Sequence, residues 1–146
     1  MTLHIQDPTD PASAYLIDTL RNACQGAVRG AGAFAFLSAG GVKLFLQDSA
    51  FQTFGQAGGA FDLIAGVDAI TDDKAMIALD EAKADTPALT ARIHMPSHPR
   101  SIFHPKVAWF EKPDGGVLVA GSGNLTAGGL RWNVEADALL CRGGGR

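Results

Sequence analysis

His104 and Lys106 place an imidazole and an ammonium two residues apart in an apolar, aromatic stretch of sequence. We expect a strand over residues 103–111, and because strand residues alternate between faces, both side chains then share one face. A neutral imidazole can attack phosphorus, and a neighbouring ammonium can neutralise phosphate oxygens. Lysine is rarely buried without a partner, so this face must open onto water, an anion or a carboxylate. A lone histidine here would more simply be a satisfied polar residue on a strand, but the pair, together with Ser122 and Asn124 near the end of the next strand, predicts an anion site.

A glycine-rich segment follows at residues 121–124, where we expect the next strand to end. Ser122 supplies a hydroxyl and Asn124 a carboxamide, while Gly121 and Gly123 give the backbone freedom to approach a ligand. A turn hydroxyl that satisfies local backbone is the alternative interpretation of Ser122. We expect this segment to meet the face that carries His104.

Two carboxylates share one face of the last expected strand, Glu135 and Asp137. Either can accept a hydrogen bond from an imidazole and so fix its tautomer, and a solvated strand face is the alternative. Before the His104 strand, His98 and Arg100 lie in an expected loop over residues 95–101, where they are available to contact a polyanion. The sequence leaves the choice between the two carboxylates open.

The order of H-x-K, G-S-x-N and a glutamate eleven residues after the asparagine resembles the half-site of the phospholipase D superfamily. The similarity is greatest to its small single-motif bacterial endonucleases and restriction-enzyme catalytic domains. The resemblance implies that His104 is the nucleophile and forms a phosphohistidine, and that Lys106 and Asn124 hold the non-bridging oxygens. It also implies that Ser122 belongs to the site and that Glu135 accepts a bond from the imidazole. The implied activity is that of a phosphodiesterase, more specifically a nuclease, which needs no metal and no cofactor.

The family pattern has an aspartate five residues after the lysine, where this chain has Glu111. Alternation along the strand points residue 111 away from the His104 face, which makes a structural role more plausible than a catalytic one. The substitution also supports an alternative, a nucleic-acid-binding module of a restriction or helicase system that has lost turnover. A phospholipid hydrolase is a third hypothesis. A closed zinc site on His94, His98 and His104 is disfavoured, because two prolines interrupt the spacing and no cysteine is near.

Such a mechanism needs two imidazoles, one to attack and one to protonate the leaving oxygen. The chain carries one H-x-K and no internal repeat, so it supplies half a site. We therefore expect a homodimer that pools two half-sites across a two-fold axis, with nucleic acid as the substrate. The alternative is a second half on sequence beyond residue 146, which would make residues 1–146 the N-terminal domain of a longer protein.

Composition predicts one domain, because 146 residues with 47% hydrophobic content can bury a core. The net charge of −3 gives no general affinity for nucleic acid, which must depend on local groups such as Arg92, Arg100, Lys106 and Arg131. No run of apolar residues predicts a membrane span, and the start of the chain does not resemble a secretion signal. We interpret the two cysteines as reduced thiols and expect a cytoplasmic protein.

Hydrophobic periodicity and the order of elements predict an α/β sandwich with a mixed sheet flanked by helices, and the resemblance implies that it is a phospholipase D-like αβα sandwich. We expect helices at residues 10–27, 40–56 and 71–84, and a short one starting at Thr126. The helix at 10–27 should begin at Thr9-Asp10-Pro11, and Thr71-Asp72-Asp73 should cap the helix at 71–84. We expect strands at residues 30–37, 61–66, 89–94, 103–111, 117–120 and 133–140.

Overall fold

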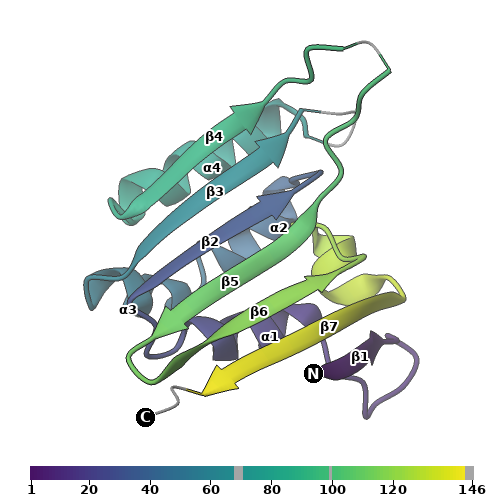
Figure 1. Cartoon of the computed structure of the whole chain (residues 1–146). Helices are drawn as coiled ribbons and strands as arrows, with labels where there is room; N and C mark the ends of the chain where they lie inside the picture. The colour runs from purple at the N-terminus through teal and green to yellow at the C-terminus, as the bar shows by residue number, and fades with distance from the viewer. Residues whose placement is uncertain (68–70, 99, 144–146) are drawn as a thin grey trace.

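A computed structural model describes residues 1–67, 71–98 and 100–143. In these residues one mixed sheet contains β1 (Thr2–Gln6), β2 (Arg29–Phe34), β3 (Ala60–Gly66), β4 (Leu89–His94), β5 (Lys106–Lys112), β6 (Gly115–Gly121) and β7 (Glu135–Gly143). The strand order is β1-β7-β6-β5-β2-β3-β4. β2, β3 and β4 are parallel, whereas β5, β6, β7 and β1 pair antiparallel to their neighbours. The first strand therefore lies beside the last (Figure 1).

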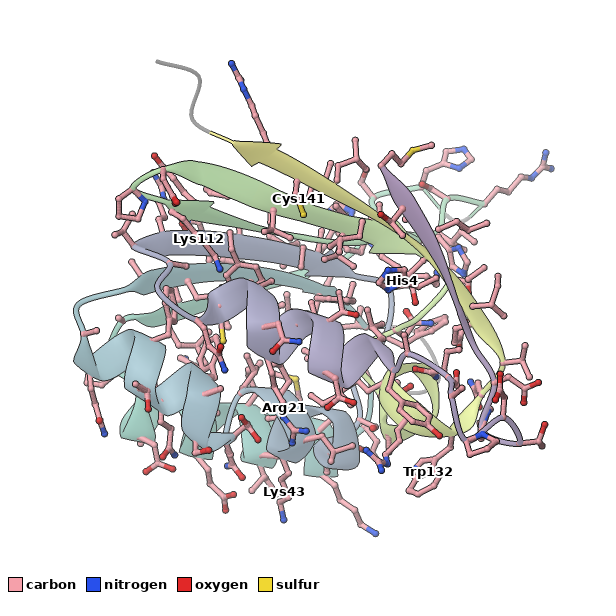
Figure 2. The ribbon with its side chains drawn as sticks, turned by 90° about the horizontal axis from the view of Figure 1, so that it is seen from below. His4, Arg21, Lys43, Lys112, Trp132 and Cys141 are labelled. Carbon is pink, nitrogen blue, oxygen red and sulfur yellow. The ribbon has the colours of Figure 1, made fainter. Side chains whose placement is uncertain are left out.

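The helices lie together on one face of the sheet (Figures 1 and 2). They are α1 (Leu16–Cys24), α2 (Ala39–Phe45), α3 (Ser49–Gln56), α4 (Asp73–Asp85) and a π-helical turn, η1 (Gly128–Trp132). The expected α/β fold, with helices flanking a mixed sheet, is confirmed. Among the described residues, however, the second helical layer of the expected sandwich is missing, so the opposite sheet face is open.

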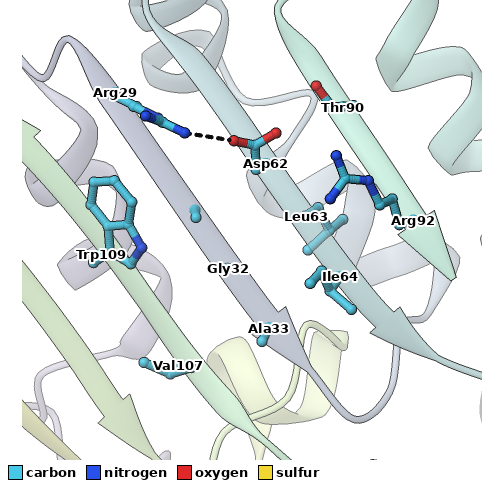
Figure 3. A pocket seen from close by; sticks show the side chains of 11 residues that line it. Arg29, Gly32, Ala33, Asp62, Leu63, Ile64, Thr90, Arg92, Val107 and Trp109 are labelled. Atoms are coloured by element: carbon cyan, nitrogen blue, oxygen red, sulfur yellow. Dashed lines mark hydrogen bonds and ion pairs between the residues drawn. The ribbon is translucent and has the colours of Figure 1, made fainter. Parts of the chain in front are cut away.

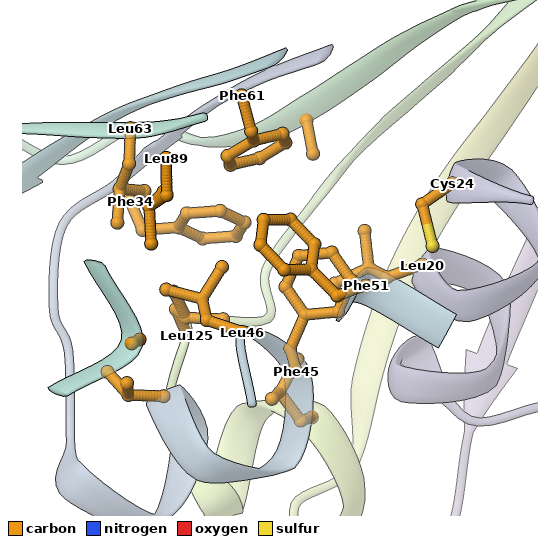
Figure 4. Packing of buried hydrophobic residues seen from close by; sticks show 14 of the residues in the cluster. Leu20, Cys24, Phe34, Phe45, Leu46, Phe51, Phe61, Leu63, Leu89 and Leu125 are labelled. Carbon is orange, nitrogen blue, oxygen red and sulfur yellow. The ribbon is translucent and has the colours of Figure 1, made fainter. Parts of the chain in front are cut away.

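The core lies between the sheet and the helices and contains a cluster of phenylalanine rings (Figure 4). The Phe61 ring packs 5.3 Å from the Phe51 ring and 5.5 Å from the Phe110 ring, measured between centroids. Gly30 on β2 makes this possible, because a Cβ there would lie 2.8 Å from the Phe110 ring and 2.9 Å from the Phe61 ring. The central strand thus carries glycine so that aromatic rings can cover its backbone.

The open sheet face contains a hollow of about 360 Å³ that crosses β5, β2, β3 and β4 (Figure 3). Its floor on β2 is formed by Ala31 and Ala33, and Trp109 stands at one side. Arg29 and Asp62 form an exposed ion pair with a 3.3 Å N–O distance at its rim. None of the residues that line this hollow belongs to the expected site.

Two helix predictions need correction. The helix expected from residue 10 begins at Leu16, because Asp7 and Asp10 accept backbone N–H groups of Thr9 and Ala12 at 2.9 and 2.8 Å. These carboxylates cap local turns instead of a helix. The single helix expected at 40–56 is two helices, since the Asp48 carboxylate accepts the Ala50 N–H at 2.9 Å and starts α3 there.

Strand positions agree more closely with expectation. β4 has the expected bounds, β3 begins one residue earlier than expected, and Asp72 caps α4 by accepting the Ala75 N–H at 2.9 Å. β1 was not predicted. Its apolar residues, Leu3 and Ile5, are exposed whereas its polar Gln6 is buried, which reverses the usual pattern.

Candidate active site

His104 and Lys106 are in contact at the start of β5. The Lys106 Nζ lies 3.1 Å from Nδ1 and 3.2 Å from Nε2 of the imidazole, and it donates to the His104 carbonyl oxygen at 3.2 Å. The strand begins at Lys106 and not at residue 103 as expected, so His104 precedes it. The two side chains therefore meet as predicted, but the backbone contact of Lys106 brings them together and not alternation within a strand.

Lys106 occupies a partly dry position. It lines a small internal cavity with Leu16 and Leu20 of α1 and with Asp137 of β7. Burial lowers the pKa of the Lys106 ammonium from its usual value, and the charge of Glu135 opposes this shift. Within the described residues no ion pair joins Lys106 to a carboxylate, so its ammonium is available to bind an anion.

Phe36, which follows β2, links His104 to Asn124. The imidazole packs edge-on against the Phe36 ring, with centroids 5.9 Å apart and an interplanar angle of 79°. The Phe36 backbone N–H donates to Asn124 Oδ1 at 3.2 Å. Because that bond uses the amide oxygen, the Asn124 NH₂ group is left to donate elsewhere. The structure thus brings together the imidazole, the ammonium and the carboxamide that the sequence singled out.

Ser122 and Glu135 form a second cluster with Asn133, next to Lys106. The Ser122 hydroxyl donates to one Glu135 oxygen, and Asn133 Nδ2 donates to the other at 3.1 Å. Ser122 Oγ also accepts the Ala136 N–H at 3.0 Å. Both Glu135 oxygens are therefore engaged, and the expected bond from the imidazole is not among the hydrogen bonds of the described residues. Glu135 instead holds the 121–124 segment to the start of β7.

Asp137, the other carboxylate considered for the imidazole, is buried beneath the same segment, with 7% of its surface exposed. Burial raises the pKa of its carboxyl group and the charge of Glu135 adds to the rise, while a bond from the Gly123 N–H and the nearby His4 oppose it. A Cβ on Gly121 would lie 2.1 Å from Asp137 Oδ1. Gly121 and Gly123 are thus required at least for close packing of this loop, in addition to any contact with substrate.

The buried side chain of Gln6 on β1 forms hydrogen bonds to η1 and to the residue that follows it. Its Nε2 donates to the carbonyl oxygens of Gly129 at 3.2 Å and Asn133 at 2.9 Å, and its Oε1 accepts the Leu16 N–H at 2.8 Å. The side chain is 1% exposed, so these bonds form away from water. Gln6 therefore positions the residues that lead into Glu135.

The sequence analysis missed Gln6, Phe36 and Asn133. Only Asn133 carried a usable signal, because in an extended chain it stands two residues before Glu135 and shares its side. Gln6 is 123 residues from Gly129, and Phe36 acts through its ring and its backbone. Neither relation can be inferred from local spacing.

The remaining residues considered for the site lie outside these clusters. His98 and Arg100 are exposed, and His98 Nδ1 accepts the Arg100 N–H at 3.2 Å in a local turn. No hydrogen bond joins either side chain to His104 or Lys106 in the residues that the structure describes. His94 stacks on Phe103, with centroids 4.6 Å apart.

Glu111 lies near the far end of β5, five residues from Lys106, and borders a hollow on the open face with Leu118 and Leu140. Lys106 borders the internal cavity on the helical side. The prediction that Glu111 points away from the catalytic face is therefore confirmed. A carboxylate at this position cannot reach a ligand held by Lys106.

Comparisons with known proteins bear on the fold. No protein-family model matches the sequence, and no curated protein matches it. Among solved structures the chain is similar to Nuc from Salmonella typhimurium, a phospholipase D family member, with a TM-score of 0.68 and 14% identity over 97% of this chain and 83% of that one. NucT from Helicobacter pylori matches with a TM-score of 0.66 and 12% identity over 94% of this chain and 82% of that one.

A mutant of yeast tyrosyl-DNA phosphodiesterase matches with a TM-score of 0.57 and 12% identity, over 94% of this chain but 31% of the yeast protein. At such identities the comparisons show the architecture and not the activity. The chain therefore has the α/β fold of phospholipase D family structures across nearly its whole length.

Proposed function

We propose that the protein is a metal-independent phosphodiesterase, and specifically a nuclease, with His104 as its nucleophile. An imidazole nitrogen attacks phosphorus, the bond to the leaving oxygen breaks, and that oxygen takes a proton from a second imidazole. The second imidazole, now neutral, takes a proton from water as the water oxygen attacks the phosphohistidine; the P–N bond breaks, and both imidazoles return to their starting states. The contact between the His104 imidazole and the Lys106 ammonium, within 3.1 Å, is the observation that carries this proposal.

Lys106 and Asn124 stabilise the charge that develops on the non-bridging oxygens. The ammonium is partly desolvated, and the Asn124 oxygen already accepts the Phe36 N–H, so the NH₂ group faces the other way. Donors fixed before the substrate arrives need little reorganisation in the transition state. The cluster of Ser122, Asn133 and Glu135 supports this arrangement by holding the loop that carries Asn124.

The second imidazole comes from a second copy of the chain. One H-x-K is present, and two identical half-sites facing each other across a two-fold axis would supply both histidines. If both are needed, an exchanged mixture of equal amounts of wild-type and His104→Phe subunits has about one quarter of the activity of wild-type protein at the same total concentration, because about one quarter of the dimers are wild-type. Activity that falls only by half would show that each chain acts alone.

The nucleophile is tested by DNA cleavage in excess chelator, with His104→Phe and His94→Phe as a matched pair. Both substitutions keep an aromatic ring against a phenylalanine, against Phe36 and Phe103 respectively, and both remove an imidazole. We expect His104→Phe to abolish cleavage and His94→Phe to retain it. An acid-labile phosphoenzyme should form in the wild type and in His94→Phe but not in His104→Phe, and cleavage by His104→Phe would refute the assignment.

A second candidate function is nucleic-acid binding without turnover. Its support is that Glu135 is engaged by Ser122 and Asn133, so His104 has no orienting carboxylate among the described hydrogen bonds. This alternative predicts salt-sensitive binding of DNA that Lys106→Ala weakens, with no phosphoenzyme. Rapid-quench labelling of the wild type with ³²P-labelled DNA decides between the two.

A further inference from the structure

Trp132 is an exposed aromatic residue at the edge of the candidate active site. It ends η1, directly before Asn133, and 64% of its surface is exposed (Figure 2). Tryptophan is usually well buried, because its ring is the largest apolar group in proteins. An indole left in water at this position has no role in the core and is available to a ligand.

The indole is held by its neighbours. The Arg131 guanidinium lies 5.5 Å from the centre of the Trp132 ring and 4.9 Å from that of Tyr15, so it stands near two aromatic faces. The backbone is fixed as well, because the Asn133 N–H donates to Gly128 at 2.8 Å and its carbonyl accepts from Gln6 at 2.9 Å. Arg131 thus supports the ring while adding positive charge beside it.

Trp132 belongs to the helical turn that packs against the segment carrying Asn124. It is three residues from Glu135, and three extended residues span about 10 Å at most. Glu135 is near enough to Lys106 for its charge to act on the ammonium. Gly129 of the same turn packs against the Asn124 backbone, since a Cβ on Gly129 would lie 2.5 Å from the Asn124 nitrogen. A nucleotide whose phosphate contacts Asn124 would therefore have its own base or a neighbouring base near η1, which carries the indole.

We propose that Trp132, supported by Arg131, stacks an unpaired base next to the scissile phosphate, so that the substrate is single-stranded nucleic acid. The proposal rests on the phosphodiesterase function above and narrows its substrate class. Bases have a planar π face for an indole to cover, whereas common phospholipid headgroups do not, and bases in a duplex are already stacked. The adjacent guanidinium favours an anionic polymer over a neutral partner.

Binding is measured on the non-cleaving His104→Phe protein with fluorescein-labelled oligo-dT and with an abasic strand of equal length. Trp132→Ala should weaken oligo-dT binding roughly 5- to 150-fold, the usual range for one stacked base, and should reduce the preference for oligo-dT over the abasic strand. Trp132→Phe should restore part of that preference. Ile77→Ala, which removes another exposed apolar side chain on α4, should change neither affinity.

Intrinsic fluorescence gives an independent measurement. The chain has two tryptophans, so Trp109→Phe leaves Trp132 as the sole emitter, and oligo-dT should quench it while the abasic strand should not. Equal effects of Trp132→Ala on both strands, or no quenching, would overturn the proposal even if the wild type cleaves DNA. If binding depends on Trp132 but the wild-type protein never cleaves nucleic acid, the base-stacking site is upheld and the phosphodiesterase function is refuted instead.

Discussion

Replacing Gln6 with methionine tests whether this buried side chain holds the loop beneath the candidate site. Methionine keeps the length and most of the volume of glutamine but can neither donate nor accept in the same way. The change removes one acceptor for the Leu16 N–H and two donors to the Gly129 and Asn133 carbonyls. Each such bond contributes about 1 kcal/mol net. We therefore expect the free energy of unfolding to fall by about 3 kcal/mol, a large part of the stability of a domain this size.

Urea unfolding followed by circular dichroism measures this change, and Gln56→Met provides the matched control. Gln56 is exposed at the end of α3, so the same chemical replacement there should alter the unfolding free energy by less than about 0.5 kcal/mol. Gln6→Glu is informative too, because it keeps the acceptor for Leu16 but loses both donors and buries a charge. We expect it to be at least as unstable as Gln6→Met at neutral pH.

A loss below about 1 kcal/mol for Gln6→Met would refute the reasoning, since three buried bonds cannot be removed so cheaply. Activity gives a second readout under conditions in which the variant is fully folded. Because Gln6 fixes the Asn133 carbonyl, and Asn133 donates to Glu135, cleavage should decrease even where the fold is intact. Full activity in the folded variant would show that the loop needs no support from β1.

Three further predictions concern ionisation. The pKa of Asp137 is raised above its ordinary value of 3.8, so the free energy of unfolding of the wild type falls as pH rises from 3.8 through the pKa of the folded state. Asp137→Asn has no such group, so its stability relative to the wild type should increase over that pH range. A difference in urea midpoints between the two proteins that does not change with pH would contradict this. Glu135→Gln removes the charge that opposes the lowered pKa of Lys106, so the alkaline limb of the cleavage profile should move to lower pH, and an unmoved limb would count against the coupling. Burial raises the pKa of Cys24 to about 11, so iodoacetamide at pH 8 should label the exposed Cys141 alone, as seen by mass spectrometry, until denaturant is added.

The sequence predicted the pairing of His104 with Lys106, the approach of Asn124 and most of the sheet. These relations come from short spacings and from apolar runs such as those of β3 and β4, where local pattern and buried position agree. The start of β5 was misplaced because Phe103 continues the apolar run, although pairing with β2 ends at Lys106. The extent of backbone pairing with β2 sets the start of β5, and the apolar type of Phe103 does not reveal it.

Other features could not be predicted because residues far apart in the sequence determine them. Glu135 was expected to bind an imidazole, but Ser122 and Asn133 occupy its oxygens once the loop and β7 are side by side. β1 was overlooked because its polar Gln6 is buried while its apolar residues face outward. The helix break at Asp48 follows from a carboxylate that caps α3 and also binds Arg21 at 2.8 Å.

The position of β1 beside β7 also bears on how the chain matures during synthesis. Gln6 is translated more than 120 residues before its partners Gly129 and Asn133. Chains are translated from the N-terminus at about 5–20 residues per second, so several seconds pass between the synthesis of β1 and that of β7, its partner in the sheet. The contacts of Gln6 that support the loop carrying Asn124 therefore cannot form until residues 129–133 have been translated, so the order of synthesis delays the assembly of the candidate site.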